Sequence, residues 1–545
     1  MALKFGFDTS KIINDSIYNF LNDIKKFYEN YYTFLVIFTI LLGAFIRFLP
    51  LLLIGLPQEI PFNGGGLYYS FSVSIIENYF HYPINIPYYS TLGVPFAYNP
   101  LVFYFVAFLA TYLKISPFIL HIYLPTIFSI ISLVLFYIFA RSLFQNKNIV
   151  ITSTFFYCIL PNAFSELIFG EGLVESFGTM LYLIGVIFLF HIYDGGKYKY
   201  CIFSGILFGI IILGSPGGAL AFAITLMIIP FFKENFKSAI KTIFSVSIIG
   251  AIVSAPWWMT VIYYHGINSI TNGVLWRNPN ILTYLFKILG FNTGCGWLFG
   301  TILVLLGFIY CLILRKWLFP IWFFFIFLAS TREIGYIVPV IAALLMAIGL
   351  IKVILPSLNF LESSKTGHNI FTSIFLILIC IHGVGTALYY NTEFHFTETD
   401  IPVSYNKLRD AEINGFSAIS WAKDNSSIDS RFFIVGDRDL WWAGDWLPVL
   451  LQRPVINVDY GSEWAGNYHK IVKMKKTIIE QLRNGDIDSS EKIANEYGTY
   501  FTYIFIVKSD DTKDLITILR MNNKIKPGYE NDNTIIFEVI PGTLE

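Results

Sequence analysis

Charged residues are scarce in this sequence. Lysine, arginine, aspartate and glutamate make up only 14% of its 545 residues, whereas 55% are hydrophobic and 18% are aromatic. Soluble domains carry about 25% charged residues, so this composition excludes a chain that folds entirely in water. Apolar runs of about 20 residues, the length that crosses a bilayer, predict instead an α-helical, multi-pass protein of the cell membrane.

Cysteine is also rare. The chain has five, with no CxxC pair and no His/Cys spacing typical of a zinc site. They lie in or beside apolar segments, where we expect them to pack: Cys158, Cys201, Cys295, Cys311 and Cys380. The first 30 residues lack the apolar core of a signal peptide, so the first span is expected to anchor the chain. There is no GxGxxG, no P-loop and no basic stripe, and nucleic acid is therefore not an expected partner.

The net charge of zero conceals two differently charged regions. Residues 1–391 contain 13 acidic and 20 basic side chains, and residues 392–545 contain 24 and 17. We infer three parts: a cytoplasmic N-terminal segment (1–32), a transmembrane part (33–391) with a long first exterior loop (57–117), and an exterior soluble α/β domain (392–545).

About eleven segments are apolar enough to span the membrane. They lie near residues 33–56, 118–140, 149–165, 172–193, 200–214, 217–232, 242–264, 296–314, 317–329, 334–355 and 370–391. A further run, Leu101–Leu113, is interpreted as a helix that dips into the membrane or lies on it. With that choice 15 basic residues of the loops become cytoplasmic and only 3 exterior, namely Arg277, Lys287 and Arg332. The positive-inside rule then places the N-terminus in the cytoplasm and the C-terminal domain outside.

One cation, Arg47, lies inside the first span. A guanidinium in lipid without a partner is costly. We therefore expect Arg47 to face the bundle, to reach the membrane surface, or to pair with a carboxylate or a lipid phosphate.

The C-terminal region alternates between helix and strand patterns. Helices are predicted at Tyr405–Ala422, Trp442–Leu451, Lys470–Leu482 and Thr512–Met521, and strands at Arg431–Gly436, Pro454–Val458, Phe501–Val507 and Thr534–Ile540. This order predicts an α/β domain with a mixed sheet.

The exterior loops hold the candidate functional residues. The first, of about 60 residues, is rich in aromatic residues, proline and glycine. Long ordered loops are commonly functional, although tyrosines also form the aromatic belt at a bilayer interface. In the second loop, Glu166 is followed by Glu171 and Glu175, four residues apart at the start of a span. The latter two would share a helix face and could hold a divalent cation such as Mg or Mn, or they could merely complement the helix dipole.

A third exterior segment carries the few cations of that face. It runs from Gly266 to Gly296 and includes Trp276, Arg277 and Lys287. These residues would suit an anionic lipid head group. Ordinary anchoring at the interface is the alternative.

The arrangement of these loops resembles the GT-C class of membrane glycosyltransferases, which includes oligosaccharyltransferases and protein mannosyltransferases. The stretch from Leu67-Tyr68-Tyr69 to Gly93-Val94-Pro95-Phe96-Ala97-Tyr98-Asn99-Pro100-Leu101 is similar to their first exterior loop. Gly170-Glu171-Gly172 lies where the oligosaccharyltransferase catalytic subunit has its second acidic motif. Members of the class take a sugar or glycan from a polyprenyl-phosphate carrier, so the resemblance implies a lipid-linked sugar as a partner.

The C-terminal region contributes to the resemblance. Asp445-Trp446-Leu447-Pro448, Arg453-Pro454-Val455 and Gly461-Ser462-Glu463-Trp464 are similar to an exterior segment of polytopic relatives of archaeal or bacterial type. Arg453, Glu463 and Trp464 could contact an acceptor or glycan, or they could pack the domain onto the membrane part.

One departure from the class concerns the base. Relatives place an aspartate just before the glycine and tyrosines of the first loop, whereas this chain has Asn63-Gly64-Gly65-Gly66. The resemblance places Asn63, Tyr68 and Tyr69 at the substrate site, but an amide cannot act as a base. Glu59 or Glu171 would then supply the carboxylate, or the chemistry has been lost.

These observations lead to a glycosyltransferase as the first hypothesis. A carboxylate, Glu59 or Glu171, would deprotonate an acceptor hydroxyl while a cation, Arg277 or a metal on Glu171 and Glu175, stabilises the leaving phosphate. A transporter is the second hypothesis, for which membrane-embedded charges and an inverted repeat would be expected. A catalytically inactive protein that binds glycan or lipid is the third.

Overall fold

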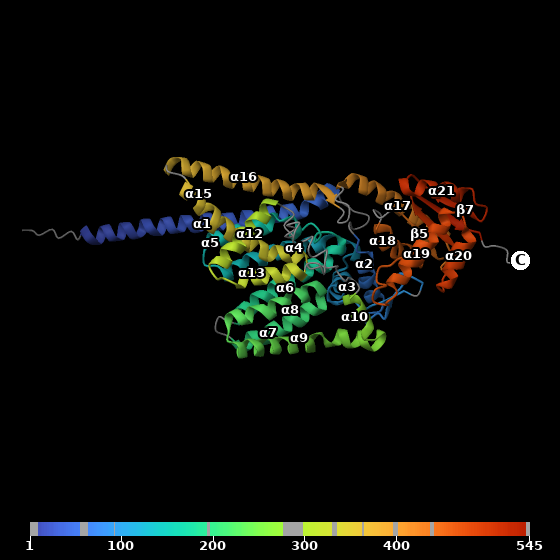
Figure 1. The fold of residues 1–545 in the computed structure, drawn as a ribbon, viewed down its shortest axis with the longest axis horizontal. Coiled ribbons are helices and arrows are strands. Elements are labelled where there is room, and N and C mark those ends of the chain that lie inside the picture. The colour runs from blue at the N-terminus through green and yellow to red at the C-terminus, as the bar shows by residue number, and fades with distance from the viewer. Residues whose placement is uncertain are drawn as a thin grey trace, which may run out of the picture.

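The computed structural model describes residues 9–54, 64–91, 93–192, 197–275, 298–329, 335–361, 365–395, 402–436 and 441–540. A bundle of helices forms one end of the molecule and an α/β region the other, with α2 (Gly66–Glu77) and α10 (Ile267–Leu275) near the boundary between them (Figure 1). The two differently charged regions of the sequence therefore correspond to two ends of the molecule.

Six helices within these ranges are long and apolar enough to cross a membrane. They contain the segments Tyr31–Leu53, Pro117–Leu143, Gly170–His191, Pro216–Lys233, Phe236–His265 and Gly335–Leu358. Shorter apolar helices cover Leu101–Leu113, Lys199–Gly214, Phe299–Ile313, Leu318–Ala329 and Ile374–Tyr389. The prediction of a multi-pass, mostly helical membrane protein is thus confirmed. The count of about eleven spans and the orientation of the termini remain predictions.

The helices of the bundle follow the predicted segments closely. They are α1 (Thr9–Ile54), α4 (Pro117–Leu143), α5 (Lys147–Ile159), α6 (Leu173–His191), α7 (Lys197–Gly214), α8 (Pro216–Lys233), α9 (Phe236–His265), α12 (Leu298–Ile313), α13 (Leu318–Ala329), α14 (Val338–Gly349), α15 (Leu355–Leu361) and α16 (Lys365–Thr392). A π-helical turn, Leu350–Ile354, joins α14 to α15. Helix α16 runs along the outside of the bundle beside α1 (Figure 1).

Ser-Pro pairs determine where two of these helices begin. The hydroxyl of Ser116 accepts a hydrogen bond from the amide of Phe118 at 3.3 Å, and Pro117 is the first residue of α4. Ser215 likewise accepts from Gly218 at 3.2 Å before α8. A serine oxygen satisfies an amide that has no partner in the first turn, and proline already has the φ of a helix.

Glycines allow α7 and α9 to pack closely. A Cβ built on Gly205 would lie 2.6 Å from Cβ of Ile249, and one built on Gly250 would lie 2.7 Å from a ring carbon of Phe208. Helices in lipid gain little from the hydrophobic effect, so they associate mainly through such close van der Waals contact.

Arg47 faces the interior of the bundle and is fully buried. Its Nε donates to the Ser129 hydroxyl at 3.0 Å, and its terminal nitrogens donate to the carbonyls of Gly43, Tyr157 and Cys158 at 3.1 to 3.4 Å. Of the three placements expected for it, the structure shows the first. The guanidinium thereby connects α1, α4 and α5.

The first exterior loop is folded rather than extended. It contains α2, the short strands β1 (Asn85–Ile86) and β2 (Val94–Pro95), which pair antiparallel, and α3 (Leu101–Leu113). Phe71 of α2 contacts Phe103 of α3, with ring centroids 4.8 Å apart. With 13 residues, α3 is about 20 Å long, shorter than the ~30 Å hydrocarbon core. The interpretation that α3 dips into the membrane or lies on it remains a prediction, because α5 and α13, which are predicted spans, have only 13 and 12 residues.

The C-terminal region is built on a mixed four-stranded sheet in the order β5-β6-β8-β7. Strands β5 (Phe432–Val435) and β6 (Tyr503–Val507) are parallel, and β8 (Thr534–Val539) is antiparallel to both β6 and β7 (Ile525–Glu530). The helices are α17 (Tyr405–Asn425), α18 (Trp441–Leu451), α19 (Tyr468–Arg483), α20 (Ile487–Glu496) and α21 (Lys513–Arg520). A two-stranded ladder, β3 (Glu393–His395) with β4 (Pro402–Ser404), precedes α17.

Several elements of this region differ from the prediction, among them the short ladder of β3 and β4, which was not predicted. The segment Pro454–Val458 is not a strand of the sheet: only Val455 forms bridges, one to Phe432 of β5 and one to Tyr89 of the first loop. Strand β7 and helix α20 were not predicted. Pro527 and Gly528 lie within β7 and most of the strand faces solvent, so its sequence lacks the apolar alternation of a half-buried strand.

Candidate functional site

Three segments that are distant in the sequence meet at the glycines of the first exterior loop: this loop, the second exterior loop and α18. Gly64 and Gly65 have positive φ, 71° and 99°. A Cβ on Gly65 would lie 2.9 Å from the carbonyl carbon of Gly170 in the second loop, and one on Gly66 would lie 2.6 Å from the carbonyl carbon of Asp445 in α18. No side chain fits between these backbones, so the glycine turn requires residues without one.

Glu171 and Glu175 lie on either side of the start of α6. Glu171 is exposed, in the 3₁₀ turn Gly170–Gly172, and Glu175 is half-buried one turn further on. Both carboxylates act on the same phenol, that of Tyr68 in α2. The pKa of Tyr68 lies well above its ordinary value, first because of burial and then because of the neighbouring Tyr98, Glu175 and Glu171. The two acids of the second loop therefore lie near Tyr68 of the first-loop helix.

Tyr68 and Tyr69 point in different directions from α2. The hydroxyl of Tyr68 donates to that of Tyr98 at 3.1 Å, on the side of the two acids. The ring of Tyr69 packs against Phe118, His121 and Trp446, at centroid distances of 5.6 to 5.7 Å. Of the two tyrosines predicted to bind substrate, Tyr68 thus lies with Glu171 and Glu175, and Tyr69 lies at the contact between α4 and α18.

Of the candidate residues of the C-terminal region, Arg453 lies at the C-terminal end of α17. Arg453 is buried, and its guanidinium donates to the carbonyls of Lys423, Ser426, Ser427 and Gln452 at 2.7 to 3.4 Å, beyond the end of α17. This arrangement satisfies the carbonyls that a helix end leaves without partners.

Trp464 packs onto the first loop, with its ring 5.4 Å from Tyr98 and 5.9 Å from Phe71. Glu463 is half-buried beside it. Glu59, Asn63, Trp276 and Arg277 lie outside the described residues.

The carboxylates of the two loops offer few ligands for a metal. Within the described ranges, no group of three or more histidine, cysteine, aspartate or glutamate side chains could hold a metal ion. Glu171 and Glu175 supply two carboxylates. Magnesium is often bound through one or two carboxylates together with substrate phosphates, with water completing the octahedron, so this donor set fits Mg better than zinc, which requires three or four protein ligands.

Sequence reasoning did not identify Asp445 as a site residue. Its carboxylate accepts from the amides of Gly66 and Leu67 at 2.7 and 2.9 Å, and it is only 3% exposed. Burial raises the pKa of Asp445 to about 6, against the opposing effect of the backbone amides. The sequence holds two separate signals: α2 begins with glycines and has no side-chain cap of its own, and Asp445 belongs to a segment that carries the resemblance. Nothing in the sequence connects the two positions, which are hundreds of residues apart.

Comparison with known proteins gives matches among solved structures. No protein-family model matches the sequence, and no curated protein matches it. The Archaeoglobus fulgidus oligosaccharyltransferase in complex with zinc and sulfate aligns with 93% of this chain and 73% of its own, with a TM-score of 0.59 and 14% identity. AglB of the same organism, with an inhibitory peptide and a dolichol-phosphate, aligns over 88% and 70% of the two chains, with a TM-score of 0.57 and 12% identity.

A solved structure from another organism also aligns with most of this chain. ArnT from Cupriavidus metallidurans, bound to undecaprenyl phosphate, aligns over 92% of this chain and 97% of its own, with a TM-score of 0.53 and 12% identity. The chain has the GT-C fold. The resemblance seen in the exterior loops is thus confirmed, and at these identities it is a likeness of fold. Within this GT-C fold, the first loop, the second loop and α18 meet at one glycine turn.

Proposed function

We propose that this protein is a GT-C membrane glycosyltransferase that moves a sugar or glycan from a polyprenyl-phosphate carrier to an acceptor on the exterior face. The observation that carries the proposal is that the second loop meets the first at the glycine turn, with Gly65 against Gly170, and brings Glu171 and Glu175 near enough to Tyr68 to raise its pKa. Structures with this fold contain lipid phosphates of the required kind, a dolichol-phosphate in AglB and undecaprenyl phosphate in ArnT.

Glu171 is the proposed base. Its carboxylate is exposed and would take the proton of an acceptor hydroxyl as that oxygen attacks the anomeric carbon of the donor. The bond from this carbon to the carrier phosphate breaks, and the phosphate oxygen keeps the electron pair. Glu175, half-buried below it, and the hydroxyls of Tyr68 and Tyr98 would orient the sugar through hydrogen bonds.

The charge on the leaving phosphate needs a cation. Arg277 is one candidate, and a divalent cation such as Mg or Mn on Glu171 and Glu175 is the other. A carboxylate that binds a metal is a weaker base, so the two versions differ in their base: Glu171 acts with Arg277, whereas Glu59 acts with the metal. A bound divalent cation would neutralise phosphate charge without a proton transfer.

The test is transfer from radiolabelled polyprenyl-phosphate sugars by the purified full-length protein, with and without a chelator. Glu171→Gln is expected to reduce turnover by about 100-fold or more, the usual contribution of a general base. Glu166→Gln is the matched control, because it removes an exposed carboxylate from the same loop. Binding of donor without turnover over a broad donor panel would favour the inactive binding protein, and uptake of substrate into vesicles would favour the transporter.

Chelator sensitivity distinguishes the two versions of the mechanism. Activity that survives the chelator and is lost in Glu171→Gln supports Glu171 as base with Arg277. Activity that requires the metal, and is lost in both Glu59→Gln and Glu171→Gln, supports the metal-bound version.

A further inference from the structure

A continuous seam joins the first exterior loop to the C-terminal region. The hydroxyl of Tyr89 donates to the carbonyl of Asp445 at 2.6 Å, and the indole of Trp446 donates to the carbonyl of Gly64 at 3.1 Å. Backbone bonds continue the seam, because Val455 donates to Tyr88 at 3.0 Å and accepts from Ser90 at 3.2 Å. Of the two bridges that Val455 forms in place of the predicted strand 454–458, the one to Tyr89 is therefore part of this contact.

Asp445 lies at the centre of the seam and caps the N-terminus of α2. Both of its carboxylate oxygens are used, one by the amide of Gly66 and the other by that of Leu67. Helix α2 has no side-chain cap of its own, since the residue before it is Gly65. The first amides of a helix need acceptors from outside the helix, and a carboxylate there also interacts favourably with the helix dipole.

The same helix determines the position of the proposed site. Only one residue separates Gly66, which contacts the backbone of Asp445, from Tyr68, whose pKa is raised by the nearby Glu171 and Glu175. Gly65 lies directly against Gly170, the residue before Glu171. Any shift of the N-terminus of α2 therefore changes the separation between Tyr68 and the proposed base.

We propose that Asp445 is a positioning residue: its carboxylate, supplied by α18 of the C-terminal region, holds α2 in register with the acids of the second loop. The C-terminal region thereby acts as part of the site without contacting the reacting atoms. This proposal rests on the proposed glycosyltransferase function for its catalytic consequence, whereas the holding of α2 can be measured without any substrate.

The first arm of the test is hydrogen exchange on the purified full-length protein. In Asp445→Asn one acceptor of the pair becomes an amide NH₂, which cannot accept from a backbone amide. We expect exchange of the backbone amides at 66–70 to rise by about ten-fold, the equivalent of one lost charge-assisted hydrogen bond, while exchange in β6 and β8 stays unchanged.

The control is Asp511→Asn, which removes an exposed carboxylate from the same region. Tyr89→Phe serves as a milder variant if Asp445→Asn does not fold. It removes the hydroxyl that donates to the backbone carbonyl of Asp445 and accepts from Ser70, and we expect a smaller rise at the same amides.

The second arm is turnover. Asp445→Asn is expected to lower kcat by about ten-fold, with KM for the lipid-linked donor unchanged, because a misplaced helix lowers the fraction of productive complexes rather than the binding of the carrier. Unchanged exchange at 66–70 would overturn the proposal whatever the activity. Faster exchange with unchanged kcat would also overturn it. If the unaltered protein has no transferase activity, the proposed function fails, and the exchange arm alone then decides whether Asp445 holds α2.

Discussion

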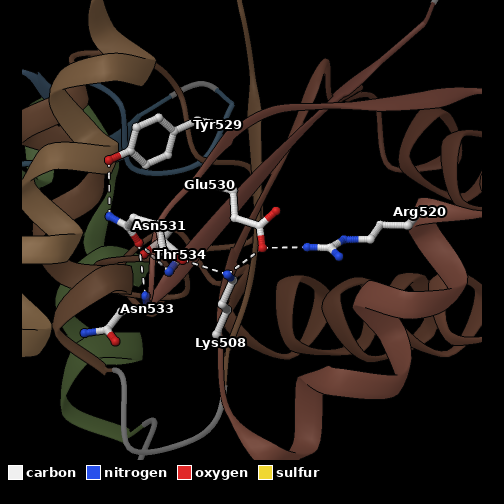
Figure 2. A network of polar contacts seen from close by, with 7 residues as sticks. All are labelled: Lys508, Arg520, Tyr529, Glu530, Asn531, Asn533 and Thr534. Carbon is white, nitrogen blue, oxygen red and sulfur yellow. Dashed lines mark hydrogen bonds and ion pairs between the residues drawn. The ribbon is translucent and has the colours of Figure 1, made fainter.

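Arg47 in the helical bundle and Glu530 in the C-terminal sheet are both charged residues with several partners, but their surroundings differ. Arg47 is fully buried, and its partners are three carbonyls and a hydroxyl. Glu530 is 37% exposed in its side chain and pairs with Lys508 at 2.6 Å and Arg520 at 2.5 Å, as Figure 2 shows. The bundle stabilises its buried charge with backbone dipoles, whereas the sheet edge uses opposite charges in water.

Asp445 is a third case, since it is buried like Arg47 but belongs to the C-terminal region. Its pKa is raised by burial, and that of Glu530 is lowered by the hydrogen bond from Lys508. The pKa values of two carboxylates in one region are thus shifted in opposite directions, that of Asp445 upward and that of Glu530 downward. The comparison indicates that the seam resembles the interior of the bundle more than the surface of the sheet.

Removing the guanidinium from the bundle should have the largest effect on stability. Arg47→Ala leaves the Ser129 hydroxyl and two carbonyls of α5 without their donors and opens a cavity, so we expect a loss of about 4 kcal/mol. The measurement is thermal unfolding of the protein in detergent micelles. Arg141→Ala, at the exposed end of α4, is the control and should change little. A loss below about 1 kcal/mol for Arg47→Ala would mean that water or lipid replaces the guanidinium.

The bundle could be predicted from the sequence and the seam could not, for a physical reason. Apolar runs and Ser-Pro starts are local, so segments such as 118–140 and 217–232 correspond closely to α4 and α8. The contact of Asp445 with Gly66 joins positions 379 residues apart, and no local pattern encodes it. The same holds for Val455, whose apolar neighbours indicated a strand although its bridges connect two regions.

The site was predictable in part. The spacing of Glu171 and Glu175 indicated a shared helix face, whereas Glu171 lies in the 3₁₀ turn before α6 and Glu175 lies in the first turn of that helix. Arg453 and Trp464 were chosen because cations and indole rings suit glycans, but such residues also suit a helix end and an aromatic core. Whether Arg453 and Trp464 bind a glycan or pack within the protein depends on their neighbours. These include Ser427 and Tyr98, which come close only in the folded chain.

Adding a methyl group at Gly66 should weaken the contact between the first exterior loop and the C-terminal region. In Gly66→Ala the new Cβ would lie 2.6 Å from the carbonyl carbon of Asp445 and 2.9 Å from Cα of Trp446. Backbone atoms cannot move aside as a flexible side chain can, so we expect a loss of about 3 kcal/mol, measured by thermal unfolding. Gly385→Ala in α16 is the matched control. Its Cβ would meet nothing within 4 Å, and it should be neutral or slightly stabilising. Equal effects at the two positions would show that the seam opens easily.

Asp445 should make stability fall as the pH rises. The folded protein binds the proton of Asp445 more tightly than the unfolded chain does, because the pKa is raised to about 6 from 3.8. The proton-linked part of its contribution is therefore largest below about pH 4 and is lost as the pH rises through about 6, whereas the hydrogen bonds from the amides of Gly66 and Leu67 remain in the ionised form. Linkage converts this shift to about 3 kcal/mol. We expect the difference in unfolding free energy between the unaltered protein and Asp445→Asn to shrink by that amount from pH 4 to pH 7. A difference independent of pH would show that the carboxylate is hydrated.

The surface network of Figure 2 should have the smallest effect and the opposite dependence on pH. The pKa of Glu530 is lowered by Lys508, so its contribution is present at neutral pH and is lost as the pH falls through that lowered value. Because the side chain is more than a third exposed, solvent screening limits the contribution to about 1 kcal/mol. Glu530→Gln is expected to lower the unfolding free energy by this amount at low salt and by less at 1 M salt, where the Debye length is about 3 Å, with the exposed Glu480→Gln as control. An equal loss at both salt concentrations would show that Glu530 acts through hydrogen-bond geometry rather than charge, and the sheet edge would then resemble the bundle.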